Sequence, residues 1–192
     1  KKGIRFIFNI EPQRLYSKDT FTIHESKLSL YQPLRVQFKD ENGELRENYL
    51  ESSFIDYLDR NSDLIEWFWE NGAEQTITNF GIGYNKDLST FQPDFIVKFR
   101  NGKIGIFDTK PTNQRIEDTN LKSNALQEYL CIENKRRQEL GLCEVIGGII
   151  ISNSYNATTK RYTNFLLFNE SEFAEYEQRP SKWIPFDAIL RS

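Results

Sequence analysis

The chain has no methionine, only one histidine and only two cysteines among its 192 residues. Because it has no initiator methionine, we expect it to be a piece of a longer protein or a trimmed form. A single histidine excludes any metal site built from several histidines, and a Ser-His-Asp or Cys-His system would depend wholly on His24. Cys131 and Cys143 do not form a Cys-x-x-Cys motif, so we expect two buried free thiols and no thiolate zinc site.

Long apolar runs and nucleotide-binding motifs are also missing. No run approaches 18 apolar residues and no signal peptide opens the chain, so we expect a cytoplasmic protein with no membrane partner. Neither Gly-x-x-x-x-Gly-Lys-Ser/Thr nor Gly-x-Gly-x-x-Gly occurs, which leaves no recognisable nucleotide site. The net charge of −3 lacks the basic excess of many nucleic-acid binders, although a local basic stripe can still meet phosphate.

The hydrophobic fraction of 38% is enough for one folded core. We expect an α/β (α+β) fold with a central mixed β-sheet flanked by helices. Residues 1–43 are an N-terminal extension of uncertain structure, and residues 44–192 form the main domain. Within that domain we expect a core over 44–151, followed by C-terminal strands and a tail over 152–192.

Hydrophobic periodicity predicts the order of the elements along the chain. These are strands over 4–10 and 34–38, an amphipathic helix over 44–61, a short helix over 63–72 closed by Asn71-Gly72, a strand over 76–84, a hairpin over 91–110, a helix over about 119–140 capped by Gly141, a central strand over 143–151, a strand over 162–168 and a loosely defined tail.

The hairpin FQPDFIVKFRNGKIGIFDTK, residues 91–110, places charged residues in strands that are otherwise apolar. A two-residue loop at Asn101-Gly102 would put Asp94 and Asp108 on opposite faces. A three-residue loop over 100–102, with Gly102 in the left-handed region, would place Asp94 directly opposite Asp108, with Lys110 on the same face. The sequence leaves both loops open.

Two facing carboxylates would lie about 5 Å apart. They need a cation between them or a proton on one of them. With no usable His or Cys nearby, an all-oxygen site favours Mg²⁺ or Mn²⁺. The alternative is that Asp94 and Asp108 merely end strands and cap loops, with Lys110 in solvent.

Two helices place charged residues on apolar faces. Glu51 lies in the middle of the face that carries Phe54 and Leu58, where a Glu needs a partner, and Glu47 is the second candidate on that face. The alternative is that Glu51 reaches the rim or pairs with a Lys. On the later helix, Lys122 reaches either solvent or a phosphate.

A basic border is the remaining candidate feature. Lys98 and Arg115 are candidate nucleic-acid contacts at its edge, although surface charges of this kind commonly serve only solvation.

These residues resemble the PD-(D/E)xK nuclease superfamily. The resemblance rests on Glu51, Pro93-Asp94 and Asp108-Thr109-Lys110, and on a helix–strand–strand–strand–helix–strand order like that of the restriction-endonuclease core. The runs LIEWFWENG, PDFIV, NGKIGIFDTK and LKSNALQEYL are similar to the nuclease domain at the C-terminal end of type III restriction enzymes and related helicase–nucleases. The resemblance covers about residues 44–151.

The resemblance implies a Mg²⁺- or Mn²⁺-dependent endodeoxyribonuclease of a restriction–modification system. Lys110 would position or activate the attacking water, and Lys122 would be a secondary phosphate contact. The implied metal ligands are Asp94, Asp108, the Thr109 carbonyl and Glu51. The implied partners are DNA, an ATP-dependent helicase or translocase domain on the same chain, and a modification or specificity subunit.

Two other functions remain open at this point. One is a catalytically inactive nucleic-acid-binding or assembly module with the same fold. The other is an unrelated metal-dependent phosphoesterase that acts on small molecules.

Overall fold

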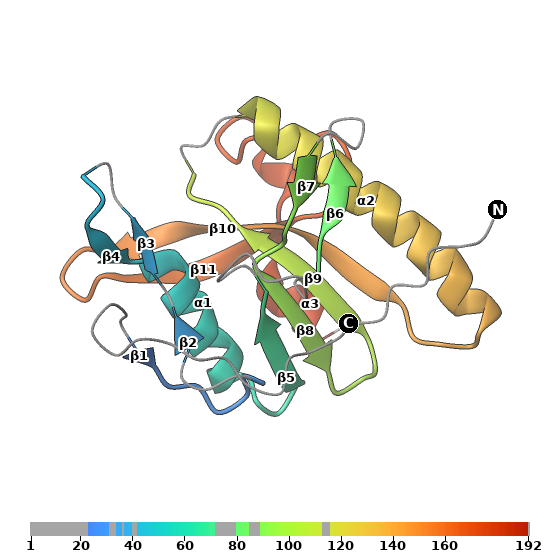
Figure 1. The fold of residues 1–192 in the computed structure, drawn as a ribbon, viewed down its shortest axis with the longest axis horizontal. Coiled ribbons are helices and arrows are strands. Elements are labelled where there is room, and N and C mark those ends of the chain that lie inside the picture. The colour runs from blue at the N-terminus through green and yellow to red at the C-terminus, as the bar shows by residue number, and fades with distance from the viewer. Residues whose placement is uncertain are drawn as a thin grey trace.

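The computed structural model describes residues 23–30, 34–35, 37–39, 42–71, 80–84, 89–112 and 116–191, so the strand predicted over 4–10 lies outside the described residues. A six-stranded mixed sheet forms the centre of the molecule (Figure 1). In spatial order its strands are β12 (Ile184–Pro185), β11 (Arg161–Phe168), β10 (Val145–Asn156), β9 (Ile104–Thr109), β8 (Phe95–Phe99) and β5 (Ile65–Glu70). Strands β9 and β10 are parallel, and the other neighbours are antiparallel. The predicted fold class is confirmed.

Helices pack against the sheet through separate cores. Helices α1 (Tyr49–Arg60) and α3 (Phe186–Leu190) share one core with strand residues such as Phe95 and Phe107. The long helix α2 (Ile116–Glu139) packs with Ile96 and Ile106, whose side chains point to the other face. In the described part of the chain, no helix is both long and apolar enough to cross a membrane.

Helix α1 begins later than predicted. Asn48 caps its N-terminus, because the Asn48 side chain accepts a hydrogen bond from the Glu51 backbone N–H at 3.2 Å. The preceding residues form strand β4 (Leu45–Glu47), which pairs with β3 (Gln37–Lys39). Gly43 lies in the connecting turn with a φ of +78°. The other short N-terminal pair is β1 (Ile23–His24) with β2 (Leu34–Arg35).

The short helix predicted over 63–72 is wrong, because this segment contains β5. Its residues are mostly aromatic or β-branched, and such side chains pack well on a pleated sheet. Phe68 is buried on the α1 side and Trp69 on the α2 side, so the strand is covered on both faces. A short run that is apolar on both faces lacks the alternation that distinguishes a strand from a buried helix.

Strand β5 therefore lies next to β8 in the sheet, in the position predicted for a strand over residues 76–84. Of that segment, residues 76–79 lie outside the described residues, and β6 (Ile82–Tyr84) pairs with β7 (Ser89–Phe91) in a separate small sheet. At the outer edge of β5, which has no neighbouring strand of the six-stranded sheet, Leu30 N–H donates to the Phe68 carbonyl and Phe68 N–H donates to the Leu28 carbonyl. The order α1, β5, β8, β9, α2, β10 is helix–strand–strand–strand–helix–strand.

The C-terminal tail is well packed, which corrects the prediction of a loosely defined end. After a 3-10 turn (Pro180–Lys182), β12 pairs with β11 and α3 turns back onto the sheet. Phe186 is buried, and its ring lies 5.3 Å from that of Phe54 and 5.1 Å from that of Phe107, measured between centroids. These edge-to-face contacts join the tail to α1 and β9.

The end of α2 follows the prediction. Gly141 has a φ of +64°, and its N–H donates to the Gln138 carbonyl while Leu142 N–H donates to the Arg137 carbonyl, as in a Schellman cap. The cysteines do not follow the prediction: Cys131 and Cys143 are free but exposed.

Candidate active site

The hairpin of β8 and β9 closes through a three-residue loop. Phe99 N–H donates to the Lys103 carbonyl at 3.1 Å, and Gly102 N–H donates to the Phe99 carbonyl at 3.0 Å. Gly102 has a φ of +94°, and a Cβ at this position would lie 2.6 Å from the Cys143 sulfur. Glycine is therefore required both by the backbone and by the neighbouring side chain. Of the two loops left open by the sequence, the three-residue loop is confirmed.

The register of this hairpin brings the two aspartates opposite one another. Phe95 pairs with Phe107, and continuing this register by one residue beyond the start of β8 places Asp94 opposite Asp108. The two carboxyls are close enough for the charge of Asp94 to raise the pKa of Asp108. The alternation of the side chains also agrees with the prediction, because Phe95 and Phe107 point to the α1 core and their even-numbered neighbours point toward α2.

Asp94 is held in place by the second strand of the hairpin. Its Oδ2 accepts hydrogen bonds from both the backbone N–H and the hydroxyl of Thr109, each at 2.7 Å. The resemblance assigned only the Thr109 carbonyl to the site. In this structure, the amide and hydroxyl of Thr109 fix the carboxylate of Asp94.

Asp108 and Lys110 form a buried ion pair. The Lys110 Nζ lies 2.7 Å from Asp108 Oδ2, and the two side chains are 17% and 2% exposed. Apart from this pair, Asp108 Oδ2 has no hydrogen-bond partner among the residues that the structure describes. The alternative that placed Lys110 in solvent is therefore wrong.

The pKa of Asp108 is raised to about 7, first by burial and then by the charge of Asp94, although Lys110 opposes this shift. For Lys110, burial lowers the pKa, but the carboxylates of Asp108 and Asp94 outweigh it and hold the pKa above its ordinary value. In the metal-free protein Lys110 is therefore a cation.

Glu51 also reaches this group of charges. Burial, then the charges of Asp94 and Glu70, raise the pKa of the Glu51 carboxyl well above its ordinary value. The side chain is half-buried, and its Oε1 accepts a hydrogen bond from Asn48 Nδ2 at 2.5 Å. Glu51 thus contacts the N-cap residue Asn48 and also lies near the carboxylates of the hairpin.

Glu70 is a fourth carboxylate that the sequence patterns did not indicate. It is the last residue of β5 and is only 4% exposed, although it carries an ionisable group. The segment had been interpreted as a helix, which would not bring Glu70 toward Asp94. A carboxylate that directly follows a run of aromatic residues was the available signal.

Asn71 is a second residue that the patterns did not indicate, since it was interpreted as the end of a helix. It is fully buried, and its side-chain amide donates to the carbonyls of Phe80 and Pro93 and accepts from Phe80 N–H, each at 2.8 Å. Its own backbone N–H donates to the Asp94 carbonyl at 2.7 Å. Asn71 therefore ties the end of β5 to the chain that enters β8, and so positions Asp94.

Two of the predicted helix residues lie in other networks. Glu47 accepts a hydrogen bond from the Ser52 hydroxyl and pairs with Arg161 at 3.3 Å, so it belongs to the contact between α1 and β11. Lys122 pairs with Asp118 at 2.6 Å on the same helix. It still lies near enough to Asp108 for its charge to lower the pKa of that carboxyl.

Of the two predicted contacts at the basic border, the structure describes only Lys98. Lys98 donates to the Gly102 carbonyl at 2.7 Å, at the loop end of the hairpin and away from Asp94. Arg115 lies outside the described residues.

The donor set fits a hard divalent cation such as Mg²⁺ or Mn²⁺, because carboxylate oxygens dominate and the single His of the chain is in β1. Within the described ranges, no three His, Cys, Asp or Glu side chains lie together closely enough to hold an ion in their present positions. The negative charge of Asp94 raises the pKa of both Asp108 and Glu51, so the ionised carboxylates repel one another. A cation between them would relieve this repulsion.

The raised pKa of Asp108 predicts how the stability of the metal-free protein depends on pH. Between about pH 4 and pH 7 the folded state binds more protons than the unfolded state, so the free energy of unfolding should fall as pH rises, by on the order of 1–3 kcal/mol. Added Mn²⁺ should restore this loss above pH 7 by neutralising the carboxylates. Urea denaturation from pH 5 to pH 8, with and without Mn²⁺, measures both effects. A stability that does not change with pH, or does not respond to Mn²⁺, would contradict the assignment.

Comparison of the chain with models of known families, with curated proteins and with solved structures found no match. The geometry of the site and the resemblance in its motifs are therefore the observations that bear on function.

Proposed function

We propose that the chain is a divalent-cation-dependent endonuclease domain that hydrolyses phosphodiester bonds in DNA. The observation that carries the proposal is the hairpin itself, where Asp94 lies opposite Asp108 and Lys110 pairs with Asp108 inside the protein. Burying such a cluster of charges costs stability unless a cation neutralises it. Clusters of this kind are typical of functional sites. The order α1, β5, β8, β9, α2, β10 supports the resemblance to PD-(D/E)xK nucleases.

Each residue of the site would have a separate role. Asp94 and Asp108, with Glu51, would hold Mg²⁺ or Mn²⁺, and the bound metal would supply Lewis-acid stabilisation of the phosphate and a more acidic water. Lys110, which stays protonated, would stabilise the extra negative charge of the transition state. Thr109 would keep the Asp94 carboxylate oriented through its amide and hydroxyl.

Glu70 would add negative charge behind the site. In the metal-free protein its carboxylate raises the pKa of Glu51, so the group of carboxylates favours a bound cation.

The same resemblance supports a wider proposal about the parent protein. The chain would be the nuclease part of an ATP-driven restriction-type enzyme in the cytoplasm, with a helicase or translocase domain on the same polypeptide and a modification or specificity subunit as partner. DNA would be the substrate brought to the site by that machinery.

Cleavage of supercoiled plasmid DNA tests the function directly. The wild-type chain should nick or linearise the plasmid with Mg²⁺ or Mn²⁺ and should be inactive with a chelator. The variant Asp63→Asn is the matched control for Asp108→Asn and should cleave like the wild type, because Asp63 is exposed in the turn after α1. DNA binding that is unaffected by chelator, with no cleavage under either metal, would instead favour the inactive binding module.

A further inference from the structure

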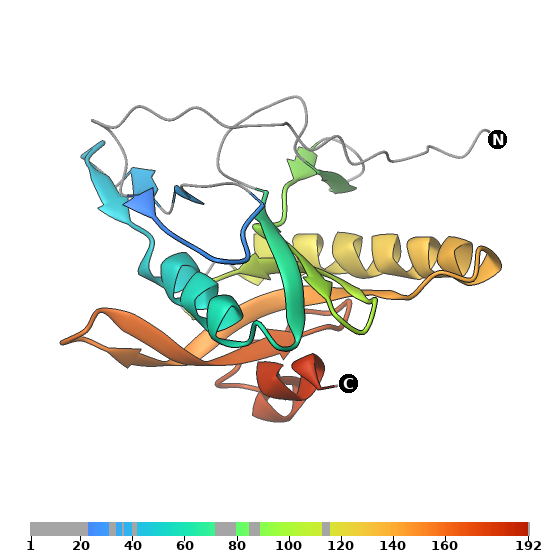
Figure 2. The same ribbon diagram turned by 90° about the horizontal axis from the view of Figure 1, so that it is seen from below.

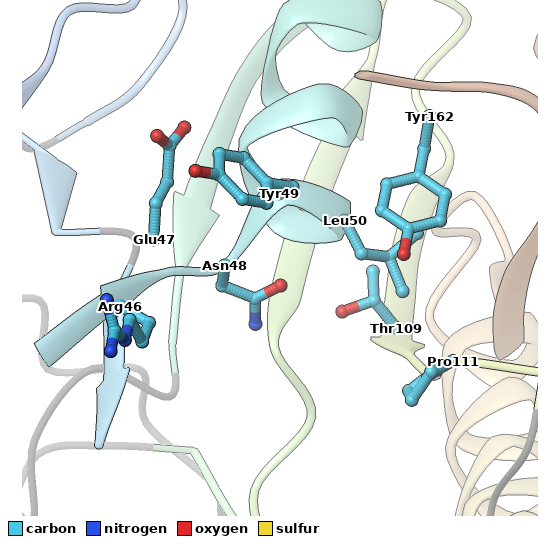
Figure 3. Close-up of a pocket in the computed structure, with 8 residues that line it drawn as sticks. All are labelled: Arg46, Glu47, Asn48, Tyr49, Leu50, Thr109, Pro111 and Tyr162. Carbon is cyan, nitrogen blue, oxygen red and sulfur yellow. The ribbon is translucent and has the colours of Figure 1, made fainter. Parts of the chain in front are cut away.

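A pocket of about 520 Å³ lies beside the carboxylates, in the size range of small-molecule sites (Figure 3). Tyr49 and Leu50 come from the first turn of α1, Thr109 and Pro111 from the end of β9, and Tyr162 from β11. In Figure 3, Tyr49 and Tyr162 stand toward two ends of the pocket, with Leu50 and Thr109 between them. Pro111 is exposed, so the pocket reaches the surface.

Two side chains connect this pocket to the proposed active site. Thr109 lines the pocket and donates to Asp94, and Asn48 lines the pocket and donates to Glu51. An occupant would therefore be separated from the carboxylates by a single side chain. The pocket is thus placed to receive the part of a substrate that adjoins the reacting phosphate.

The chemistry of the walls suits a flat aromatic group better than a phosphate. The tyrosine rings, Leu50 and Pro111 give apolar contact, whereas Asn48, Thr109 and Glu47 offer hydrogen-bonding atoms at the edge. Of the charged residues in the walls, Glu47 pairs with Arg161 at 3.3 Å and Arg46 pairs with Glu44 at 2.5 Å, so the described residues of the walls present no unpaired cation to a phosphate. A nucleobase has a π-face for the ring of Tyr162 and polar edges for these groups.

The surroundings of the pocket are suited to the backbone of a nucleic-acid strand. Beyond the rest of the sheet, β10 and β11 continue as a long two-stranded arm, residues 152–164 (Figures 1 and 2). This arm has no Asp or Glu, and it carries Lys160 and Arg161. The Lys160 Nζ lies 5.5 Å from the centroid of the Tyr49 ring, at the pocket wall. Lys160 can therefore neutralise a phosphate that flanks the bound base, whereas Arg161 is already paired with Glu47 and Asp56.

We propose that this pocket holds an unstacked nucleobase of the strand that is cut, with the base stacked on Tyr162. The inference rests on the proposed nuclease function and adds to it a requirement that one nucleotide near the scissile phosphate leaves the base stack. Enzymes that unstack a base place it in a pocket of aromatic and apolar side chains with polar groups at the edge.

The test uses DNA duplexes in which 2-aminopurine replaces one base at a time across the site of cleavage. The wild-type chain, bound in chelator so that no cleavage occurs, should change the 2-aminopurine fluorescence at one position and not at its neighbours. The variant Tyr162→Ala should remove this signal and weaken binding about tenfold, as expected for the loss of one stacking platform. The variant Tyr162→Phe, which keeps the ring, should retain both.

Tyr155→Ala is the matched control. The Tyr155 ring packs 4.6 Å from that of Tyr162 but does not line the pocket, and it is 48% exposed. This variant should keep the position-specific signal. Circular dichroism confirms that each variant is folded before it is compared.

The outcomes separate this inference from the function on which it rests. If plasmid DNA is cleaved but no position shows a fluorescence change, or if Tyr155→Ala and Tyr162→Phe lose the signal as Tyr162→Ala does, the pocket does not hold a base and the nuclease proposal stands. If the chain neither binds nor cleaves any DNA, both proposals are overturned.

Discussion

Replacing Asp108 by Asn should abolish DNA cleavage while making the metal-free protein more stable at pH 8. The loss of activity should be at least about 1,000-fold, because a proposed ligand of the metal and a charge next to Lys110 would be lost together. The gain in stability follows from burial. At pH 8 the wild-type carboxylate, whose pKa is raised to about 7, is ionised inside the protein, and Asn removes that charge without changing the shape.

The size of this gain is limited by Lys110. Because Asp108→Asn also removes the partner of the ammonium, we expect a net gain on the order of 1–3 kcal/mol at pH 8. At pH 5 the wild-type carboxyl is already protonated, so the difference between the two proteins should largely disappear. Urea denaturation at the two pH values and plasmid cleavage in Mg²⁺ measure the two effects. An Asn variant that cuts DNA at the wild-type rate, or that is much less stable at pH 8, would contradict this view of the site.

Replacing Lys110 by Met should have a large effect on both activity and stability, and here the two should change in the same direction. Cleavage should fall by about 100- to 1,000-fold, since the cation that faces the developing charge is lost. The metal-free protein should lose about 2–4 kcal/mol at pH 8, because Asp108 and its neighbouring carboxylates remain buried without their ammonium.

The pH dependence distinguishes this effect from a simple loss of packing. At pH 5 Asp108 is protonated in the wild type, so there is little ion pair to lose and the destabilisation by Lys110→Met should shrink. Lys182→Met is the matched control, because Lys182 forms an exposed pair with Glu170 and should change stability little at either pH. Equal destabilisation at pH 5 and pH 8 would show that Lys110 acts through its aliphatic chain rather than its charge.

The hairpin was predictable from sequence because its geometry is local. A Gly at the third position of the loop, together with the alternation of apolar residues, restricts the register to two possibilities, which the sequence leaves open. The structure has the register of the three-residue loop, and Asp94 and Asp108 therefore face one another. The C-cap at Gly141 was predictable for the same reason, since its conformation depends on a few adjacent residues.

The remaining parts of the site depend on contacts between distant segments. Strand β5 is apolar on both faces, so its periodicity could not separate it from a short helix, and Glu70 and Asn71 went unrecognised with it. The role of Asn71 exists only because residues 80 and 93 come to its side chain in the fold. Similarly, Phe186 belongs to the segment predicted as a loosely defined tail, and its packing depends on contacts with Phe54 and Phe107, which are distant in sequence.

The position of Glu51 shows an intermediate case. Helical spacing correctly indicated that this carboxylate would not point freely into solvent, and its pKa is raised by the burial and the charges that it meets. The spacing did not reveal that α1 begins at Tyr49, which places Glu51 in the first turn, where Asn48 can hold it. Because α1 begins at Tyr49, Glu51 can both bond with Asn48 and lie near Asp94.

The central claim is that the hairpin of β8 and β9 holds a divalent cation between Asp94 and Asp108. Crystals of the chain soaked in millimolar Mn²⁺ and measured for anomalous scattering test it most directly. We predict a single strong anomalous peak bridging the two carboxylates, at about 2.0–2.3 Å from an oxygen of each. The peak should be absent from crystals of Asp108→Asn. If the wild-type crystals show no anomalous density between these side chains at millimolar Mn²⁺, the metal site is contradicted, and with it the proposed nuclease function.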